Sequence, residues 1–192
     1  MAFDQHDETS DEDLLALYAT GDQAAARSLM LRHAPRVLAL ARRMLKDMTE
    51  AEDVTQEAML RLWKIAPEWR SGEAKVSTWL YRITANLCTD RLRKKRGIGL
   101  DEAPEVADDT PSAEAAMISA DRGKALRDAM DLLPERQKLA VSLRHLEELS
   151  NPEIASILET SVEAVESLLS RGRRALAAEL SSKRAALGLA ME

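Results

Sequence analysis

The stretch from residue 98 to residue 122 constrains the fold of this 192-residue chain more than any other feature. It contains two prolines, and between Asp101 and Asp121 it holds seven acids and no base. Proline and mutually repelling charges favour an extended chain over a packed one. We therefore expect two small domains, 1–97 and 123–192, joined by a flexible acidic linker.

The composition of both domains favours helices. The chain has only 7 glycines and 6 prolines, the two residue types least favourable in a helix interior. Apolar residues recur at three- and four-residue steps in both halves, which is the period of one helix face. The predicted fold class is all-α.

Membrane and secreted classes are disfavoured. The single cysteine, Cys88, excludes an internal disulfide and suits a reducing cytoplasm, where we expect a buried, inert thiol. No apolar run is long enough to span a bilayer, and the acidic N-terminus is unlike a signal peptide. We expect a cytoplasmic protein without membrane insertion.

An enzyme is the least favoured function class. His6, His33 and His145 lie in no metal-ligand spacing, and the chain has no glycine-rich phosphate loop. Cys88 has no base beside it that the sequence reveals. We expect no metal, no cofactor and no small-molecule substrate, and we expect each histidine at the surface or at a helix cap.

Helix boundaries in the first half follow from capping residues. Ser10 and Asp22 can each cap a helix. Pro35 is expected to mark a joint, because proline breaks a helix interior. The segment Thr49–Glu52 matches a capping box and predicts a helix that runs to about Ala66.

The segment Val76–Arg96 predicts a helix with two chemically different faces. Its apolar stripe contains Leu80, Ile83 and Leu87. The opposite stripe is basic and rich in hydrogen-bond donors: Arg82, Asn86, Thr89, Arg93 and Arg96.

Most of the large aromatic residues of the chain lie near this helix. They are Trp69, Trp79 and Tyr81. Trp79 borders the apolar stripe and is expected in the core, whereas Trp69, in the preceding loop, is the better candidate for exposure. Cations beside aromatic rings suit single-stranded nucleic acid, because cations follow phosphates and rings stack on bases.

The net charge of −6 hides an uneven distribution. Residues 1–13 hold six acids, whereas positive charge gathers in 82–96 and 171–184. Such a chain can contact phosphates locally while its acids weaken binding to random duplex. We expect poor DNA binding by the protein alone and a partner that delivers it to DNA.

The end of the chain has the layout of a helix-turn-helix. Ser150–Glu153 matches a capping box that opens a short helix, Glu159–Ser161 forms a tight connection, and Ser161 can cap a last helix from Val162 to about Leu180. On that last helix the residues expected to face inward are Val165, Leu168 and Leu169.

Three segments together resemble one known family. They are AEDVTQEAMLRLWK (residues 51–64), STWLYRITANLCTDRLRKKR (77–96) and LLPERQKLAVSLRHLEELSNPEIASIL with SVEAVESLLSRGRRAL (132–176). In order, they resemble the polymerase-binding, −10 and −35 segments of bacterial RNA polymerase sigma factors. The group is the extracytoplasmic-function (ECF) branch of the sigma-70 family.

The resemblance implies a role for each segment, with core RNA polymerase, promoter DNA and an anti-sigma factor as partners. Polymerase binding falls on Asp53, Gln56, Glu57, Leu60 and Trp63. Contact with the −10 element falls on Trp69, Lys75, Arg82, Asn86, Thr89, Arg93 and Arg96, and the loop 67–77 takes up a flipped base. Contact with the −35 element falls on Glu166, Ser167, Ser170, Arg171, Arg173 and Arg174.

The sequence departs from the family pattern in the second domain. Glu159 stands where the family often has glycine in the turn, so the turn is either strained or of another type. Glu166 and Leu168 stand where basic residues are frequent, and Glu166 can either read cytosine or weaken phosphate contact.

Two other classes remain open at this level. A stand-alone helix-turn-helix regulator that binds DNA as a dimer would explain the second domain but not the first. An adaptor made of two helical bundles would leave the clustered arginines unexplained.

Overall fold

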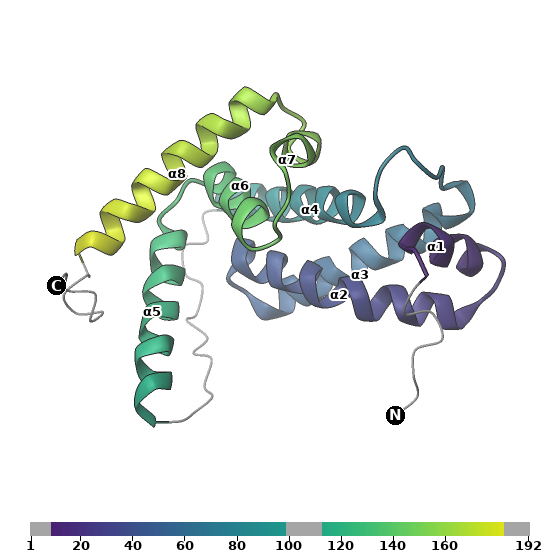
Figure 1. The fold of residues 1–192 in the computed structure, drawn as a ribbon, viewed down its shortest axis with the longest axis horizontal. Helices are drawn as coiled ribbons and strands as arrows, with labels where there is room; N and C mark the ends of the chain where they lie inside the picture. Colours follow the sequence, from purple (N-terminus) through teal and green to yellow (C-terminus); the bar gives the residue numbers. More distant parts are fainter. Residues whose placement is uncertain (1–8, 99–112, 183–192) are drawn as a thin grey trace. The chain divides into compact units, whose positions relative to one another are not determined.

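A computed structural model describes residues 9–98 and 113–182 of the chain. Within these residues all regular structure is helical: eight α-helices and one short 3-10 helix, in the order shown in Figure 1. This confirms the predicted all-α class. The chain divides into two compact units, the first with α1 to α4 and the second with α5, α6, α8 and most of α7.

The first unit is a bundle built around α2. Its elements are α1 (Asp11–Ala19), α2 (Gln23–Leu45), α3 (Met48–Ile65), the 3-10 helix η1 (Ala66–Glu68) and α4 (Val76–Ile98). Helix α2 packs against α1, α3 and α4, and α3 also packs against α4. As a result, α3 and α4 are supported from behind by α2 and also contact each other.

The core of this bundle is aliphatic with an aromatic edge. Leu14, Leu29, Leu62 and Leu80 are among its fully buried side chains. The rings of Trp69 and Trp79 pack edge to face, with centroids 6.0 Å apart, and both lie against the same core. The aromatic residues therefore close the end of the core at which α4 begins.

The predicted caps of α1 and α2 are confirmed, and that of α3 is wrong. The Ser10 hydroxyl and the Asp22 carboxylate accept hydrogen bonds from the first turns of α1 and α2. Helix α3 is capped by Asp47, which accepts from the Glu50 N–H at 3.0 Å, and not by the Thr49–Glu52 box. Lys46, at φ 59°, ends α2 so sharply that Asp47 is already extended and in capping position.

The prediction of a joint at Pro35 is also wrong, because α2 continues through it. Proline removes the N–H that would bond to the carbonyl of Leu31. Both residues are exposed, so water can bond to that carbonyl. The buried residues Leu29, Val37 and Leu40 hold the helix on both sides of the proline.

An ion-pair cluster fastens α1 to α2. Asp11 accepts from Arg32 Nη1 at 3.1 Å and lies 2.7 Å from His33 Nε2. His33 is buried, so the expected surface position of this histidine is wrong. Hydrogen bonding to His33, followed by the charges of His33 and Arg32, holds the pKa of Asp11 below its usual value.

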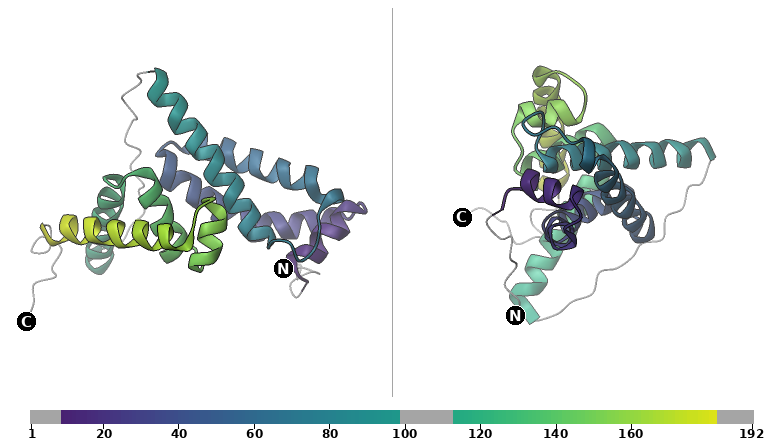
Figure 2. Two further views of the ribbon diagram at one scale, coloured as in Figure 1. Left: turned by 90° about the horizontal axis from the view of Figure 1, so that it is seen from above. Right: turned by 90° about the vertical axis from the view of Figure 1, so that its right-hand side faces the viewer.

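The second unit packs the long helix α8 against α6 and α5. Its helices are α5 (Ala113–Asp131), α6 (Glu135–His145), α7 (Asn151–Ile157) and α8 (Val162–Ser182). Helix α5 begins inside the stretch 98–122 that was predicted as linker, and residues 99–112 lie outside the described residues. Figure 2 shows α8 as a long rod that follows α7 after a short turn.

Helices α6 and α8 meet at a glycine. A Cβ atom on Gly172 would lie 2.7 Å from Cγ2 of Val141, closer than two carbon atoms can pack. Leu139, Leu143, Val165 and Leu169 are buried in the same unit. The absence of a side chain at residue 172 therefore sets how closely α8 approaches α6.

Candidate functional site

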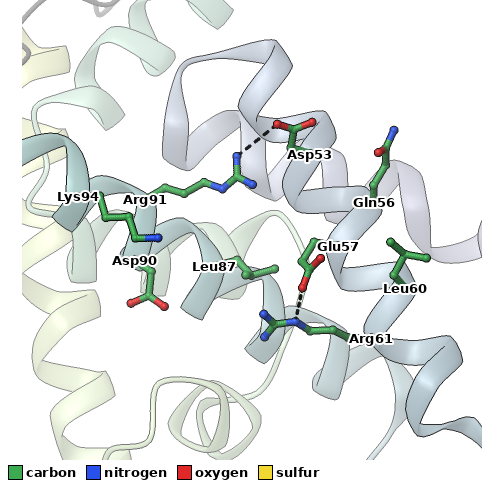
Figure 3. Close-up of a pocket in the computed structure, with 9 residues that line it drawn as sticks. All are labelled: Asp53, Gln56, Glu57, Leu60, Arg61, Leu87, Asp90, Arg91 and Lys94. Carbon is green, nitrogen blue, oxygen red and sulfur yellow. Dashed lines mark hydrogen bonds and ion pairs between the residues drawn. The ribbon is translucent and has the colours of Figure 1, made fainter.

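A groove lies between α3 and α4 in the first unit (Figure 3). Its volume is about 450 Å³. Four of the residues predicted to bind a protein partner line it, Asp53, Gln56, Glu57 and Leu60, all from α3. The predicted Trp63 does not line it, since its ring packs on Tyr18 with centroids 4.7 Å apart.

The sequence did not predict partner binding for the other residues of this groove. They are Arg61 from α3 and Leu87, Asp90, Arg91 and Lys94 from α4. Arg61 lies four positions after Glu57 and eight after Asp53, so helical spacing from the predicted residues could have found it. The contribution of α4 depends on how two helices pack, which no local pattern reveals.

The groove combines paired charges with an exposed apolar side chain. Glu57 accepts from Arg61 Nε at 2.8 Å, a hydrogen bond that lowers the pKa of the Glu57 carboxyl. Asp53 lies 3.8 Å from Arg91, as the dashed line in Figure 3 marks. Leu60 is 53% exposed. An exposed leucine framed by charges is suited to docking a protein.

The basic stripe of α4 faces away from the core. Asn86, Arg93 and Arg96 are exposed, and Arg82 and Thr89 are half-buried. Arg93 lies 3.4 Å from Asp90, an exposed pair that adds little stability. The structure thus brings all five stripe residues to one side of α4.

The buried side of α4 differs in part from the prediction. Leu80 is buried, whereas Ile83 and Leu87 are only partly buried. The most buried positions further along the helix are Tyr81, Thr84, Ala85 and Cys88. The core-facing stripe is therefore turned toward these residues, and Tyr81 is a core residue and does not edge the basic face.

The thiol of Cys88 is fully buried, as expected. Desolvation raises its pKa to about 12. A thiol that stays protonated at neutral pH is a poor nucleophile.

The loop before α4 places Trp69 and Lys75 differently. Lys75 is exposed. Trp69 is only partly exposed, its ring packs on Trp79, and its indole nitrogen is buried. Trp69, the better candidate for exposure, is thus no more than partly exposed, because a large ring beside an open end of the core gains more from burial than from water. Gly72, at φ 85°, makes the turn of the loop.

On helix α8 the residues predicted to contact DNA and the residues predicted to face inward lie on different sides. The six residues predicted for the −35 element, Glu166, Ser167, Ser170, Arg171, Arg173 and Arg174, are all exposed. Val165, Leu168 and Leu169 are buried, as predicted. Leu168 is therefore a core residue and does not replace a DNA-facing cation.

The turn between α7 and α8 is of the left-handed type. Glu159 has φ 49°, a conformation that glycine adopts at lower cost. Ser161 then caps α8 by accepting from the Ala164 N–H at 3.2 Å, and Ser150 and Glu153 form the predicted capping box of α7. The left-handed turn between α7 and α8 is therefore made without a glycine.

Residues 9–98 and 113–182 contain no group of acids, histidines and cysteine placed to hold a metal ion. In the same ranges no helix is both long enough and apolar enough to cross a membrane.

Each of the two units matches the model of a known protein family. Residues 29–98 match the model of sigma-70 region 2, and residues 123–176 match that of sigma-70 region 4. The chain belongs to the sigma-70 family of RNA polymerase sigma factors, in its ECF group. The region 2 match accounts for the first unit, which a stand-alone helix-turn-helix regulator would leave unexplained.

Individual relatives agree with this assignment. The chain is 36% identical over 165 residues to the ECF RNA polymerase sigma factor SigE of Mycolicibacterium smegmatis, covering 82% of this chain and 63% of that protein. It is 32% identical over 171 residues to SigW of Bacillus subtilis, covering 83% of this chain and 91% of that protein.

Solved structures share the fold. CnrH, solved in complex with the cytosolic domain of CnrY, matches with a TM-score of 0.67 and 26% identity, over 90% of this chain and 97% of that one. RpoE of Bartonella quintana, solved with the anti-sigma factor NepR, also gives a TM-score of 0.67, at 20% identity, over 81% and 96% of the two chains. At that identity the second match speaks for the fold alone.

Proposed function

We propose that this sigma factor divides promoter recognition among three surfaces. The α3 side of the groove docks on core RNA polymerase, the α4 stripe contacts the melted −10 strand, and the exposed side of α8 reads the −35 element. The observation that carries the proposal is the exposure of these surfaces on helices whose other sides form the two cores. The family's two matched regions supply the assignment of partners.

The docking surface uses the paired charges and the exposed leucine of α3. Asp53, Gln56 and Leu60 lie along the α3 side of the groove (Figure 3). A partner helix with complementary charges can cover Leu60 and exchange ion pairs with Asp53 and Glu57. Trp63 contributes from beneath, by holding α1 against the end of α3 through Tyr18.

A double variant tests this docking surface. We expect Asp53→Arg with Gln56→Ala to abolish binding to core polymerase in a pull-down, with unchanged helical circular dichroism. Glu52→Arg is the matched control, because Glu52 is exposed on the same helix and does not line the groove. Unchanged binding by the double variant would contradict the proposal that this surface docks on core polymerase.

The strand-contacting surface combines the α4 stripe with the loop before it. Arg82, Asn86 and Arg93 offer donors to phosphates and bases at successive turns of one side. Cationic side chains that follow a backbone hold an unpaired strand, and a flipped base can be read in a protein pocket. Lys75 and the loop 67–77 lie at the start of this stripe, with Trp69 and Trp79 as its apolar floor.

Permanganate footprinting of melted promoter DNA tests this surface. We expect Asn86→Ala with Arg93→Ala to lower open-complex formation more than initial polymerase binding. Arg36→Ala on α2 removes an exposed cation away from the stripe and serves as the control. Undiminished footprints would show that the stripe is only structural.

We further propose that the protein acts in the cytoplasm, without catalytic activity of its own, and that an anti-sigma factor binds it. CnrH was solved together with a domain of another protein, which supports a protein partner for this chain as well. Co-purification of the tagged protein from cells, with and without core polymerase, checks this. Recovery of polymerase subunits alone would argue against the additional partner.

A further inference from the structure

We infer that Arg91 and Lys95 support promoter opening indirectly. They hold α3 and α4 together and do not contact the DNA themselves. This role rests on the proposed function, because it concerns how the docking helix and the strand-contacting helix are held together. We call the two cations with Glu50 and Asp53 the α3–α4 clasp.

Three contacts define the clasp. Lys95 Nζ lies 2.9 Å from Glu50 Oε1. Arg91 Nη1 lies 3.8 Å from Asp53 Oδ2 and donates to the backbone carbonyl of Glu50 at 3.3 Å. All of these contacts cross from α4 to α3, and they place two cations of one helix on the first turns of the other.

The clasp is partly shielded from water. The side chains of Lys95 and Glu50 are 35% and 27% exposed, and Oε2 of Glu50 is buried without a hydrogen-bond partner in the described part of the chain. Burial is the main cause of the raised pKa of the Cys88 thiol, and the charges of Arg91 and Glu50 then shift that pKa in opposite directions. Partial desolvation strengthens an ion pair and raises the cost of leaving one partner alone.

Helical spacing explains why one basic run serves two surfaces. Arg91 and Lys95 are four residues apart and so share a side of α4, the side toward α3. Arg93 and Arg96 share a different side and are exposed. Lys95 would have to give up its carboxylate partner at 2.9 Å, and leave Glu50 unpaired, before it could bind a phosphate. The run 91–96 is therefore divided between fold and DNA.

The consequence is mechanical coupling between two surfaces. Asp53 belongs both to the clasp and to the docking surface, while Asn86 and Arg93 are on the helix that the clasp holds. Fixing the first turns of α3 against the end of α4 sets the stripe in register with the docked polymerase. Loosening it should impair opening of the promoter more than docking.

Neutral variants of one pair test the clasp. We expect Glu50→Gln and Lys95→Gln each to lower open-complex formation by about two- to fivefold, the range for a partly exposed ion pair. The double variant should be no worse than either single variant. Core polymerase affinity should change less than twofold in all three. Glu52→Gln, an exposed acid outside the groove, should leave both quantities unchanged.

Direct contact of Lys95 with DNA predicts a different pattern. Removing an acid would then leave opening unchanged or increase it in Glu50→Gln, while Lys95→Gln would lose activity, and that outcome overturns the clasp. Equal loss of polymerase affinity and opening, together with a lower melting temperature, would mark a merely structural pair and would also overturn it. Failure of the wild-type holoenzyme to open the promoter would instead count against the proposed function.

Discussion

Helices α4 and α8 have similar lengths, 23 and 21 residues, and both carry arginines on an outward side, yet they use their cations differently. In α4, Arg91 and Lys95 are bound to acids of a neighbouring helix. Within the described residues, no arginine of α8 forms an ion pair. This helix packs on its unit through Gly172 and aliphatic side chains. A basic run in a sequence is therefore not yet a DNA-binding surface.

The largest expected difference between the two helices follows from removing two arginines of α8. We expect Arg173→Ala with Arg174→Ala to weaken promoter binding by the holoenzyme by about thirtyfold or more, since both side chains are exposed on the side of α8 proposed to read DNA. The slope of log affinity against log salt should fall by about 2 if both contact phosphates. Filter binding across a salt series measures both effects.

The control is Lys124→Ala with Arg127→Ala, which removes two exposed cations from α5. Loss of affinity equal to that of the α8 variant would indicate a general charge effect. The distinction between an outward face and the rest of the unit would then break down.

The second prediction concerns how α8 is held. Gly172→Ala should destabilise the second unit by about 1–3 kcal/mol, because the new methyl group would overlap Val141. Val141→Ala in the same chain should recover part of the loss. Thermal unfolding followed by circular dichroism measures both, and a neutral Gly172→Ala would contradict the close approach of α6 and α8.

The third prediction concerns the turn that presents α8. Glu159→Gly should stabilise the second unit by about 1 kcal/mol. Left-handed backbone costs residues other than glycine about 1–2 kcal/mol, and the larger conformational entropy that glycine loses on folding offsets part of this gain. Thr160→Gly is the control and should destabilise or be neutral. A loss of stability in Glu159→Gly, measured by urea unfolding, would argue against the turn.

The smallest effect is expected in α1, where an acid serves the fold as the clasp acids do. The folded-state pKa of Asp11 lies below 3.8, so its ion pairs stabilise the protein above that pH and are lost as pH falls through the folded value. Asp11→Asn should cost about 1 kcal/mol near neutral pH. The difference from wild type should close below about pH 3.8, and a difference independent of pH would contradict the pairing.

Much of this architecture could be predicted from the sequence, because helical period and capping chemistry are local. The inward residues of α8 and the caps at Ser10, Asp22 and Ser161 are examples. The predictions at Pro35 and Thr49 were wrong because buried neighbours hold α2 through the proline, and because the left-handed Lys46 brings Asp47 into the capping position of α3. Local patterns could not reveal the clasp, since it depends on which acids a second helix brings within reach of α4.

Run-off transcription by the reconstituted holoenzyme, on duplex promoter and on the same promoter with a pre-melted −10 region, tests the division of labour most directly. The wild type should give promoter-dependent transcripts on both templates. Asn86→Ala with Arg93→Ala should be defective on duplex and largely recover on the pre-melted template, whereas Arg173→Ala with Arg174→Ala should stay defective on both. No promoter-dependent transcript from the wild type, or equal recovery of the two variants, would contradict this account.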